Sequence, residues 1–414
     1  RFYGEPSSSL RLVGITGTNG KTTVAHAVHQ VLNGAGVRTG LCGTIVIDDG
    51  VETARASLTT PQAIELSHTL SVMVESGLEA AAIEVSSHAL AQERVGGLHF
   101  DVGVFTNLSG DHQDYHGSMD AYLEAKRRLF LMLPPDGVAV VNADDPSCAR
   151  MTDGCNATIV RTSLDPSSDA DAHAAVVERG IDGMMLALTG PWGELKTRVG
   201  LIGRHNASNV LQAACVCHAM GVSGERLARG LSQIKPPPGR LERVAWPGGA
   251  DESFTVLVDF AHTDDALRSA LLAVRDALDG RGKLRVVFGC GGDRDRTKRP
   301  RMGAIASELG DHVIVTSDNP RTERPSDIIS EVLSGIPDSQ RSVVEVHADR
   351  REAIRVAVEA CEAGDALVIA GKGHETEQIL PAPGGGVHRI EFDDRLVARD
   401  AIGAMISERA GVDG

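Results

Sequence analysis

The stretch Gly14–Thr23, "GITGTNGKTT", decides the fold of the first half of the chain. It follows the apolar run "LRLV" (10–13), and its three glycines, lysine and threonines predict a strand, a tight turn and a helix start. The residues after it place four apolar side chains on one helical face: Val24, Val28, Val31 and Leu32. The common phosphate-binding loop, G-x-x-x-x-G-K-[ST], requires glycine where this chain has Ile15. The stretch therefore predicts a strand–loop–helix unit whose loop has an unusual spacing.

Composition narrows the class of protein. The chain has 414 residues, of which 42% are hydrophobic and 23% are charged, which is typical of a globular protein with two or three domains. Its net charge of −15 argues against a nucleic-acid partner, because binding phosphates requires a basic surface. No apolar run is long enough to span a bilayer, so we expect no membrane insertion. The seven scattered cysteines indicate reduced, mostly buried thiols of a cytoplasmic protein.

The pattern along the chain predicts two α/β domains. Apolar runs at 80–85, 102–107 and 137–142 alternate with helical patterns, which indicates a parallel sheet wound with helices. Residues 156–202 predict a small antiparallel addition to the same domain. The segment "PPPGR" (236–240) cannot continue a helix and marks a boundary. Beyond it the α/β pattern resumes, with strands expected at 255–260, 284–289, 312–317 and 366–370.

The glycine-rich loop has the composition of an anion site. Its glycines let backbone N–H groups approach a phosphate, and the following helix start adds a favourable dipole. Lys21 would then reach the terminal phosphates, and Thr22 or Thr23 would hold Mg²⁺. The alternative is a simple strand-to-helix turn with an exposed lysine.

Two further segments carry polar residues at strand ends. In "IEVSSHAL" (83–90), Glu84 ends a buried strand, although a strand end with a capping serine would look the same. In the segment 105–130, "FTNLSGDHQDYHGSMDAYLEAKRRLF", five metal-binding or polar residues are followed by a helical lysine, Lys126. The five are Asn107, Asp111, His112, Asp114 and His116. Oxygen ligands and imidazoles at the carboxyl end of a strand suit a divalent metal bound to phosphates.

Together these segments resemble the Mur ligases, the ATP-dependent amino-acid ligases of peptidoglycan biosynthesis. The resemblance extends over nearly the whole chain through ten ordered motifs. They are "GTNGKTT", "EVSSH", "TNLSGDHQDYHG", "AKRRLF", "GRHNASN", "GRLERV", "DFAHTDDAL", "FGCGGDRDRTKRP", "SDNPRTE" and "GKGHE". The resemblance implies that the Gly14–Thr23 stretch is the ATP loop in the spacing of this family.

The resemblance also implies a fold, a division into domains and a reaction. We expect residues 1–10 to be a linker that follows a uridine-binding domain absent from this sequence, or the start of a shortened relative with another carrier. Residues 11–238 would form a central P-loop ATPase domain with a parallel and a small antiparallel sheet, and residues 239–414 a Rossmann-like domain. In this family a carboxylate of the muramoyl peptide attacks ATP to give an acyl phosphate, which the amine of the incoming amino acid then attacks.

Family motifs carry catalytic and nucleotide roles onto this sequence. Lys21, Glu84, His112 and Lys126 match catalytic residues, with Lys126 carrying a carbamate; the alternative for Lys126 is a solvated helix lysine. The metal ligands implied for two Mg²⁺ sites are Thr22, Glu84, His112 and Lys126 as carbamate. The implied ATP contacts are Gly17, Thr18, Asn19, Gly20, Lys21, Thr22, Thr23, Asn107, Asn206, Asn209, Arg240, Asp259 and His262. Taken alone, Asn206 and Asn209 would more often be helix caps.

The motifs also imply the two other substrates. Contacts to the UDP-muramoyl dipeptide match Thr59, Thr60, Ser86, Gln92 and Arg94, which are weaker signals. Arg321 has the place of the arginine that marks members adding meso-diaminopimelate, because a guanidinium can bind the distal carboxylate of that amino acid with two bonds. The remaining contacts to the amino acid match Arg294, Asp318, Asn319, Pro320, Gly371 and Glu375. Alternatively, "DNPR" is a plain turn and 294–301 a solvated basic patch.

Two departures from the family pattern and several alternatives remain. Phe260 replaces the usual Tyr, and Asp264 replaces the usual Pro. A ligase for L-lysine, a folylpolyglutamate or cyanophycin-type ligase, and a non-catalytic nucleotide-binding regulator are the other candidates. Arg321 and "GKGHE" argue against the first group, and intact Glu84, His112 and Lys126 argue against the regulator. The resemblance otherwise implies a monomer in the bacterial cytoplasm that acts on small molecules.

Overall fold

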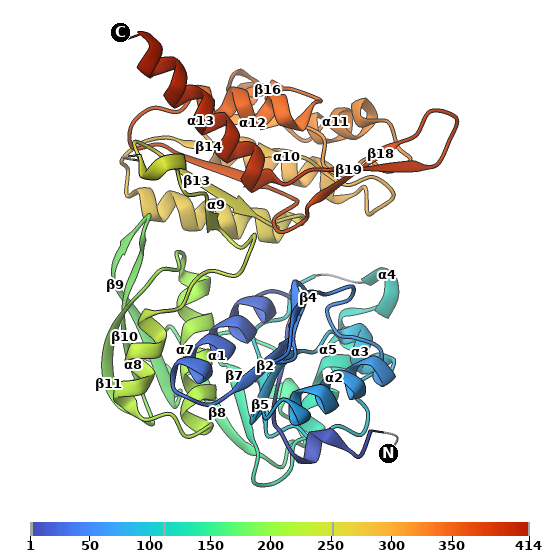
Figure 1. The fold of residues 1–414 in the computed structure, drawn as a ribbon, viewed down its shortest axis with the longest axis vertical. Helices are drawn as coiled ribbons and strands as arrows, with labels where there is room; N and C mark the ends of the chain where they lie inside the picture. The colour runs from blue at the N-terminus through green and yellow to red at the C-terminus, as the bar shows by residue number, and fades with distance from the viewer. Residues whose placement is uncertain (1–2, 111–112, 251, 413–414) are drawn as a thin grey trace. The chain divides into compact units, whose positions relative to one another are not determined.

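The computed structural model describes residues 3–110, 113–250 and 252–412, which form two compact units (Figure 1). The first unit contains Arg1–Glu178 and Gly183–Lys235, and the second contains Arg179–Asp182 and Pro236–Gly414. Each unit has its own sheet with helices on both faces (Figure 1). This arrangement confirms the predicted α/β class.

The first unit is built on an eleven-stranded sheet in the order β11-β10-β9-β8-β7-β6-β1-β5-β2-β3-β4. Its strands are β1 (Arg11–Thr16), β2 (Thr39–Cys42), β3 (Val46–Asp48), β4 (Thr53–Arg55), β5 (Ala80–Glu84), β6 (Val102–Phe105), β7 (Val138–Asn142), β8 (Thr158–Ser163), β9 (Ala172–Gly180), β10 (Gly183–Gly190) and β11 (Gly193–Val199). Strand β1 pairs in parallel with β5 on one side and with β6 on the other. The carboxyl ends of these three strands therefore lie together at one edge of the sheet.

Helices cover both faces of this sheet. They are η1 (Pro6–Ser8), α1 (Lys21–Gly34), α2 (Ala63–Glu75), α3 (Ser87–Ala91), α4 (Gln113–His116), α5 (Met119–Leu131), α6 (Cys148–Met151), α7 (Arg204–Ala219) and α8 (Gly224–Ser232). Val13 and Ile15 of β1 pack in a core with α1 and α7, whereas Leu12 packs in a second core with α2 and α5. Burial on both faces explains why the strands read as continuous apolar runs.

The predicted antiparallel part of this domain is present and is continuous with the parallel sheet. Strand β8 pairs in parallel with both β7 and β9, and β10 then pairs with β11 in antiparallel orientation. The sequence does not reveal this continuity, because pairing of β8 with β9 depends on contacts between strands and not on either strand's own pattern.

The second unit has a six-stranded sheet in the order β12-β13-β17-β14-β15-β16. The strands are β12 (Glu242–Arg243), β13 (Thr255–Asp259), β14 (Leu284–Phe288), β15 (His312–Val315), β16 (Val344–Val346) and β17 (Ala366–Ala370). All the pairs are parallel except β12 with β13. The loops after β13, β14, β15 and β17 therefore meet at one edge, where open α/β sheets bind ligands.

The remaining elements of the second unit are helices, short 3-10 turns and one hairpin. They are η2 (Pro247–Gly249), α9 (Asp264–Leu278), α10 (Lys298–Leu309), α11 (Pro325–Leu333), η3 (Asp338–Val343), α12 (Arg350–Glu359), α13 (Asp394–Val412), β18 (Glu377–Pro381) and β19 (Val387–Glu391). Ala353 and Ile354 of α12 and Val397 of α13 pack on one face of the sheet. Helices α9 and α10 pack against each other.

A fully buried ion pair braces the second unit behind its ligand-facing loops. Arg350 and Asp394 are both inaccessible to solvent, and the Arg350 Nη2 atom lies 2.7 Å from Asp394 Oδ2. The same guanidinium donates to the carbonyl of Ser317 at 3.2 Å and to that of Ala370 at 3.0 Å. One arginine thus connects the segment after β15 with the last residue of β17.

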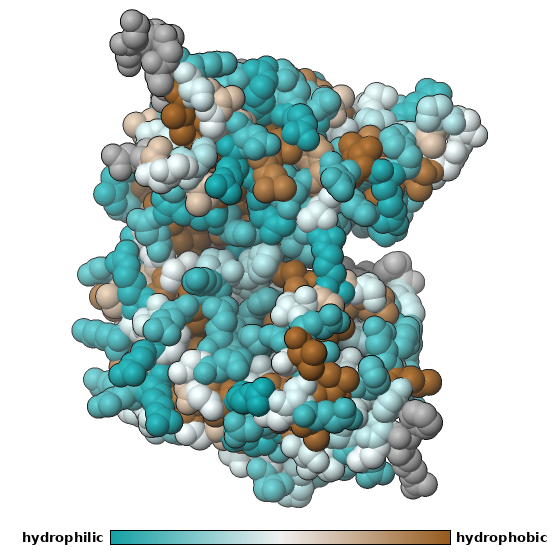
Figure 2. Space-filling model, in the orientation of Figure 1, coloured by the Kyte–Doolittle hydropathy of each residue, from teal (hydrophilic) through white to brown (hydrophobic). Residues whose placement is uncertain are grey.

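The surface and the thiols agree with the composition. Figure 2 shows hydrophilic residues over most of the visible face, with apolar residues scattered among them. Within the described residues, no helix has the length and apolar content that crossing a membrane requires. All seven cysteines are free thiols; six are buried, and Cys155 is partly buried.

Candidate active site

The loop Gly17–Gly20 lies between β1 and α1 and depends on two of its glycines. Gly17 (φ 148°) and Gly20 (φ 88°) have backbone conformations that favour glycine. A Cβ atom on Gly17 would collide with the Thr106 hydroxyl, and one on Gly20 would collide with the Asn209 side chain. The loop is therefore pressed against its neighbours, and α1 begins directly after it with its N–H groups facing the loop.

Asn107, in the segment after β6, holds the loop in place. Its carbonyl accepts from the Thr18 amide at 2.8 Å, and its side-chain oxygen accepts from the Asn19 amide at 3.0 Å. Its side-chain nitrogen donates back to the Asn19 carbonyl at 3.1 Å. Asn107 was predicted as an ATP contact, and the structure places it as a support of the loop that would bind the phosphates.

Two lysine ammonium groups converge on this loop. Lys21 Nζ donates to the carbonyls of Gly17 and Thr18, each at 2.9 Å. Lys126 Nζ, on α5, donates to the same Gly17 carbonyl at 2.9 Å and lies 4.3 Å from the centroid of the Tyr122 ring. Lys126 is only 1% exposed, so the alternative of a solvated helix lysine is wrong. The convergence of two cations at a helix start favours an anionic ligand.

Glu84 ends β5 next to the loop and is fully buried. Its carboxylate accepts from the Thr22 hydroxyl at 2.9 Å, from the Thr44 amide at 2.8 Å and from the Thr44 hydroxyl at 2.9 Å. A carboxylate and a hydroxyl beside a phosphate-binding loop are the hard oxygen donors that Mg²⁺ prefers, so these residues fit a magnesium ion. Among the described residues, no group of three His, Cys, Asp or Glu could hold a metal without other ligands. His112 and Asp111 lie outside the described residues.

Asn206 and Asn209 lie on the first turns of α7, behind the loop. Gly203 holds the N-cap position of this helix, so neither asparagine is the cap. Asn206 donates to the Ile202 carbonyl at 2.8 Å, and Asn209 donates to Asn206 Oδ1 at 2.9 Å. Both are buried, and a Cβ atom added to Gly20 would collide with the Asn209 side chain. The pair connects α7 to the phosphate loop.

The residues predicted to contact the muramoyl dipeptide form one hydrogen-bonded group. The Thr60 hydroxyl donates to the Glu84 carbonyl at 2.7 Å and lies 3.3 Å from Ser86 Oγ. Arg94 donates to the Thr60 carbonyl at 2.9 Å and also to Gln92. The neighbouring Thr59 lies 3.2 Å from the Thr44 hydroxyl. These residues therefore extend the polar surface that starts at Glu84.

In the second unit, Asp259 ends β13 and organises the segment that carries Arg240. Its carboxylate accepts from the Leu241 amide at 2.7 Å and from the Ala261 amide at 2.8 Å. Burial raises the pKa of Asp259, and the positive charge of Arg240 and the two amides oppose that shift. The Arg240 guanidinium lies 5.0 Å from the centroid of the Phe260 ring, and its Nε is buried without a hydrogen-bond partner in the described structure. An unpaired buried donor suits a residue that binds a ligand.

His262 lies three residues after Asp259 in the same loop. Its Nδ1 atom is 2.9 Å from the Phe260 carbonyl, and its own carbonyl accepts from Lys298 Nζ at 2.7 Å. Burial lowers the pKa of His262. Asp264, which replaces the usual Pro, begins α9 and pairs with Arg301 at 2.6 Å. An acidic residue suits this first helical turn, so the replacement leaves the helix start intact.

The predicted amino-acid contacts come from three strand ends of the second unit and lie together. Asp318 and Asn319 follow β15, and Gly371 follows β17, where a Cβ atom would collide with the Asp318 carboxylate. Asn319 Nδ2 donates to Glu375 Oε2 at 2.7 Å. Pro320 carries the chain from this group to Arg321, and its carbonyl accepts from the Glu323 amide at 3.0 Å.

Arg321 and Arg294 lie over the same glycine, Gly291. A Cβ atom there would be 3.0 Å from Arg321 Nη1 and 3.8 Å from Arg294 Cγ. Arg321 Nη1 donates to the Gly292 carbonyl at 2.7 Å. Burial, followed by the positive charge of Arg294, lowers the pKa of the Arg321 guanidinium. Two neighbouring guanidinium groups need an anion to offset their repulsion, which suits a carboxylate ligand.

The sequence analysis missed three residues of these sites. Thr44 makes two bonds to Glu84, Tyr122 supports Lys126, and Lys372 contacts both Asn319 and Glu375. The signal for Lys372 was present, since a lysine between two glycines at a strand end in "GKGHE" has no role in secondary structure. Thr44 and Tyr122 have no comparable signal in the sequence.

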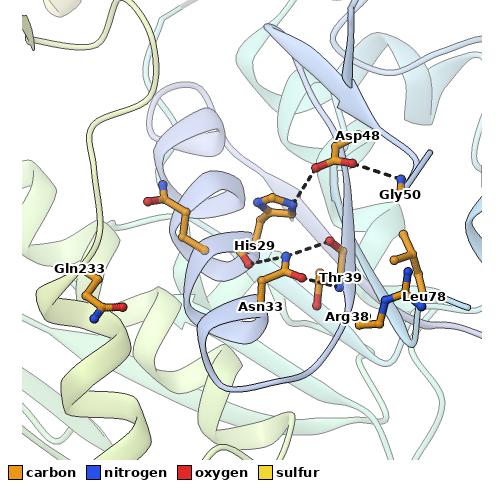
Figure 3. Close-up of a pocket in the computed structure, with 9 residues that line it drawn as sticks. His29, Asn33, Arg38, Thr39, Asp48, Gly50, Leu78 and Gln233 are labelled. Atoms are coloured by element: carbon orange, nitrogen blue, oxygen red, sulfur yellow. Dashed lines mark hydrogen bonds and ion pairs between the residues drawn. The ribbon is translucent and has the colours of Figure 1, made fainter. Parts of the chain in front are cut away.

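A hollow of about 510 Å³ in the first unit lies away from the loop. Figure 3 shows His29 and Asn33 of α1 lining it, with His29 paired to Asp48 and Asn33 bonded to Thr39. Asn33 is twelve residues beyond Lys21, or about 18 Å along the helix. The hollow is therefore separate from the candidate active site at the start of α1.

The first unit thus combines a parallel sheet, a glycine-rich loop at a helix start and a buried carboxylate, which define a nucleotide-phosphate-binding α/β protein. The Mur ligase middle domain matches residues 15–217, and the glutamate ligase domain of Mur ligases matches residues 239–373. The chain belongs to the Mur ligase family, which confirms the resemblance found in the sequence.

Several other proteins are similar to this chain over most of its length. A UDP-N-acetylmuramoyl-L-alanyl-D-glutamate–2,6-diaminopimelate ligase from Gloeobacter violaceus is 46% identical over 97% of this chain and 79% of its own length. One from Geobacillus kaustophilus is 43% identical over 97% and 80%. A solved structure of a ligase of that name has a TM-score of 0.67 at 34% identity, covering 96% of this chain and 79% of its own. Folylpolyglutamate synthase from Mycobacterium tuberculosis, at 22% identity, a TM-score of 0.71 and 89% coverage of each chain, shares the fold.

Proposed function

We propose that this chain is an ATP-dependent ligase that adds meso-diaminopimelate to UDP-N-acetylmuramoyl-L-alanyl-D-glutamate in peptidoglycan biosynthesis. The observation that carries the choice of amino acid is the group at the strand ends of the second unit. Arg321 and Arg294 lie over one glycine, and Asp318 and Glu375 provide carboxylates beside Asn319. Two cations and two anions suit an amino acid whose far end carries both an ammonium and a carboxylate.

The first unit would supply the nucleotide chemistry. Lys21 and the amides at the start of α1 would bind the phosphates, and Lys126 would add a second positive or ligating group beside Gly17. Mg²⁺ bound by Thr22 and Glu84 would neutralise negative charge on the phosphates. The protein must also orient the acceptor carboxylate towards ATP. The hydrogen-bonded group around Thr60 would do this, because it lies next to Glu84.

We further propose that Lys126 carries a carbamate. A carbamate converts the ammonium into a carboxylate-like oxygen ligand, which would complete a metal site that includes Glu84 and His112. The near-complete burial of Lys126 supports this proposal, because its Nζ atom lies at the phosphate loop, where a metal ligand would be needed, and not in solvent.

The same proposal includes the roles of the domains, the oligomeric state and the location in the cell. Residues 11–238 would act as the ATP-binding domain and residues 239–414 as the amino-acid-binding domain, with 1–10 as a linker. We also propose Arg240, Asp259 and His262 as ATP contacts. We propose a monomer in the bacterial cytoplasm.

The direct test is release of phosphate that depends on the amino acid. The protein is mixed with ATP, Mg²⁺ and the UDP-linked dipeptide, and phosphate release is measured with meso-diaminopimelate or with L-lysine. We expect release and a tripeptide product with diaminopimelate, and at least a hundredfold lower kcat/KM with lysine. Equal use of lysine would refute the assignment of the amino acid. Nucleotide binding without phosphate release from any amino acid would instead indicate a non-catalytic regulator.

A further inference from the structure

Lys372 is a fully buried cation among the residues proposed to bind the amino acid. It lies between Gly371 and Gly373 after β17, and its side chain has no solvent exposure. Its Nζ atom is 3.3 Å from Asn319 Oδ1 and 3.1 Å from Glu375 Oε2, and it also donates to the Glu377 carbonyl. An ammonium has three N–H donors, so these three acceptors satisfy it. The side chain points inward and is not a ligand contact itself.

Lys372 fixes which way the Asn319 amide faces. Asn319 Oδ1 accepts from Lys372 and from the Ile379 amide at 2.9 Å. Both partners are donors, so the oxygen must face them and the NH₂ group must face the opposite way. That NH₂ group donates to Glu375 Oε2 at 2.7 Å. Without the ammonium, one of the two donors that hold this orientation is lost.

Lys372 also holds one oxygen of the Glu375 carboxylate. The bonds from Lys372 and from Asn319 both end on Oε2, and neither uses Oε1. The Glu375 side chain is 35% exposed, whereas that of Lys372 is fully buried. One carboxylate oxygen is therefore fixed from behind, and the other is available to a cationic group on the exposed side.

We propose that Lys372 is the positioning residue of the amino-acid site. It orients Asn319 and Glu375 so that Glu375 Oε1 accepts the distal ammonium of the amino acid, while Arg321 faces the distal carboxylate. This inference rests on the proposed function, since it assumes the amino acid that the site binds. Lys372 acts through its two neighbours and makes no contact with the reacting atoms.

The test is the kinetics of Lys372→Met, which keeps the length of the side chain and removes its charge. The KM for meso-diaminopimelate should rise at least tenfold, while kcat falls less than threefold and the KM for ATP stays within twofold. Arg285→Met is the matched control, because Arg285 is a buried cation of the same sheet that pairs with Asp365 at 2.7 Å. That pair lies at the starts of β14 and β17, at the opposite edge from the amino-acid site. The control should leave the KM for diaminopimelate unchanged, whatever it costs in stability.

A double variant keeps the proposal testable if Lys372→Met fails to fold. Lys372→Met combined with Glu375→Gln removes both charges of the pair, so no uncompensated charge remains buried. Its KM for diaminopimelate should exceed that of Glu375→Gln alone by less than tenfold, because the loss of Lys372 then acts only through Asn319. A further tenfold rise in the double variant would overturn the proposal, and so would a wild-type KM in Lys372→Met. If the wild-type protein itself does not use diaminopimelate, the proposed function has failed, and that result is separate from either outcome for Lys372.

Discussion

Replacing Arg321 with alanine should reduce the use of diaminopimelate by about two orders of magnitude. Arg321 Nη1 is already bonded to the Gly292 carbonyl, which leaves the Nε and Nη2 edge for a carboxylate. Two charge-assisted bonds contribute about 1.5–3 kcal/mol each. Because the Arg321 side chain is only partly buried, the lower end of that range applies, or about 3 kcal/mol in total. At about 1.4 kcal/mol per factor of ten, kcat/KM should fall about a hundredfold.

The assay is steady-state phosphate release with diaminopimelate and with lysine as amino acids. Lysine has no distal carboxylate, so its poor use should change little, and the KM for ATP should stay the same. Arg321→Lys should recover only part of the loss, because an ammonium cannot make the planar double contact. Arg296→Ala is the matched control: this arginine lies in the basic segment 294–301, two residues from Arg294, but it is exposed and pairs with Glu331.

The backbone of Arg321 provides a second control. Its φ of 53° lies in the left-handed region, where glycine is less strained than alanine. If Arg321→Gly and Arg321→Ala lose diaminopimelate use equally, the loss comes from the guanidinium and not from a distorted turn. If Arg321→Ala keeps the wild-type preference for diaminopimelate over lysine, the specificity assignment is refuted and "DNPR" is only a turn.

Two other residues give separate predictions. Lys126→Ala should lower kcat at least a hundredfold if Lys126 carries a metal-ligating carbamate, and added bicarbonate or acetate should restore part of the phosphate release. Full activity without any addition would contradict that role. The hydrogen bond from Arg299 lowers the pKa of Glu323 to about 2, so this carboxylate stabilises the fold above its ordinary pKa of 4.5 and stops doing so as the pH falls towards 2. Glu323→Gln should therefore lower the free energy of unfolding in urea at pH 7 by about 1–2 kcal/mol after solvent screening, and the difference from wild type should vanish near pH 2.

The sequence predicted best those parts of the fold that local patterns determine. The strand, loop and helix around Gly14–Thr23 followed from apolar spacing and glycines, and the structure has β1, the loop and α1 in those places. The strand ends were less accurate. The run 312–317 was expected to be strand throughout, but β15 ends at Val315, and the Ser317 carbonyl in the following loop accepts from Arg350. That contact depends on the tertiary structure, so no local sequence pattern predicts it.

In the candidate site, too, some residues could be predicted from the sequence and others depend on tertiary contacts. Residues in motifs, such as Lys21 and Arg321, could be named because the family resemblance extends to them. Thr44 could not, because its two bonds to Glu84 depend on β2 lying beside β5, although the two strands are separated by about forty residues of sequence. Residues that support a site from another strand are visible only once the pairing of the strands is known.

The buried pair of Arg350 and Asp394 has a consequence for the order in which the protein is made. Arg350 connects the segment after β15 with the end of β17, but its countercharge comes from Asp394, which is translated after every strand of the six-stranded sheet. A buried charge without its partner costs about 3–5 kcal/mol. During translation, all the residues proposed to bind the amino acid can therefore be synthesised before the edge of the six-stranded sheet that carries them is stable. A nascent chain that stops before residue 394 would carry the whole set of contacts without the means to hold them in place.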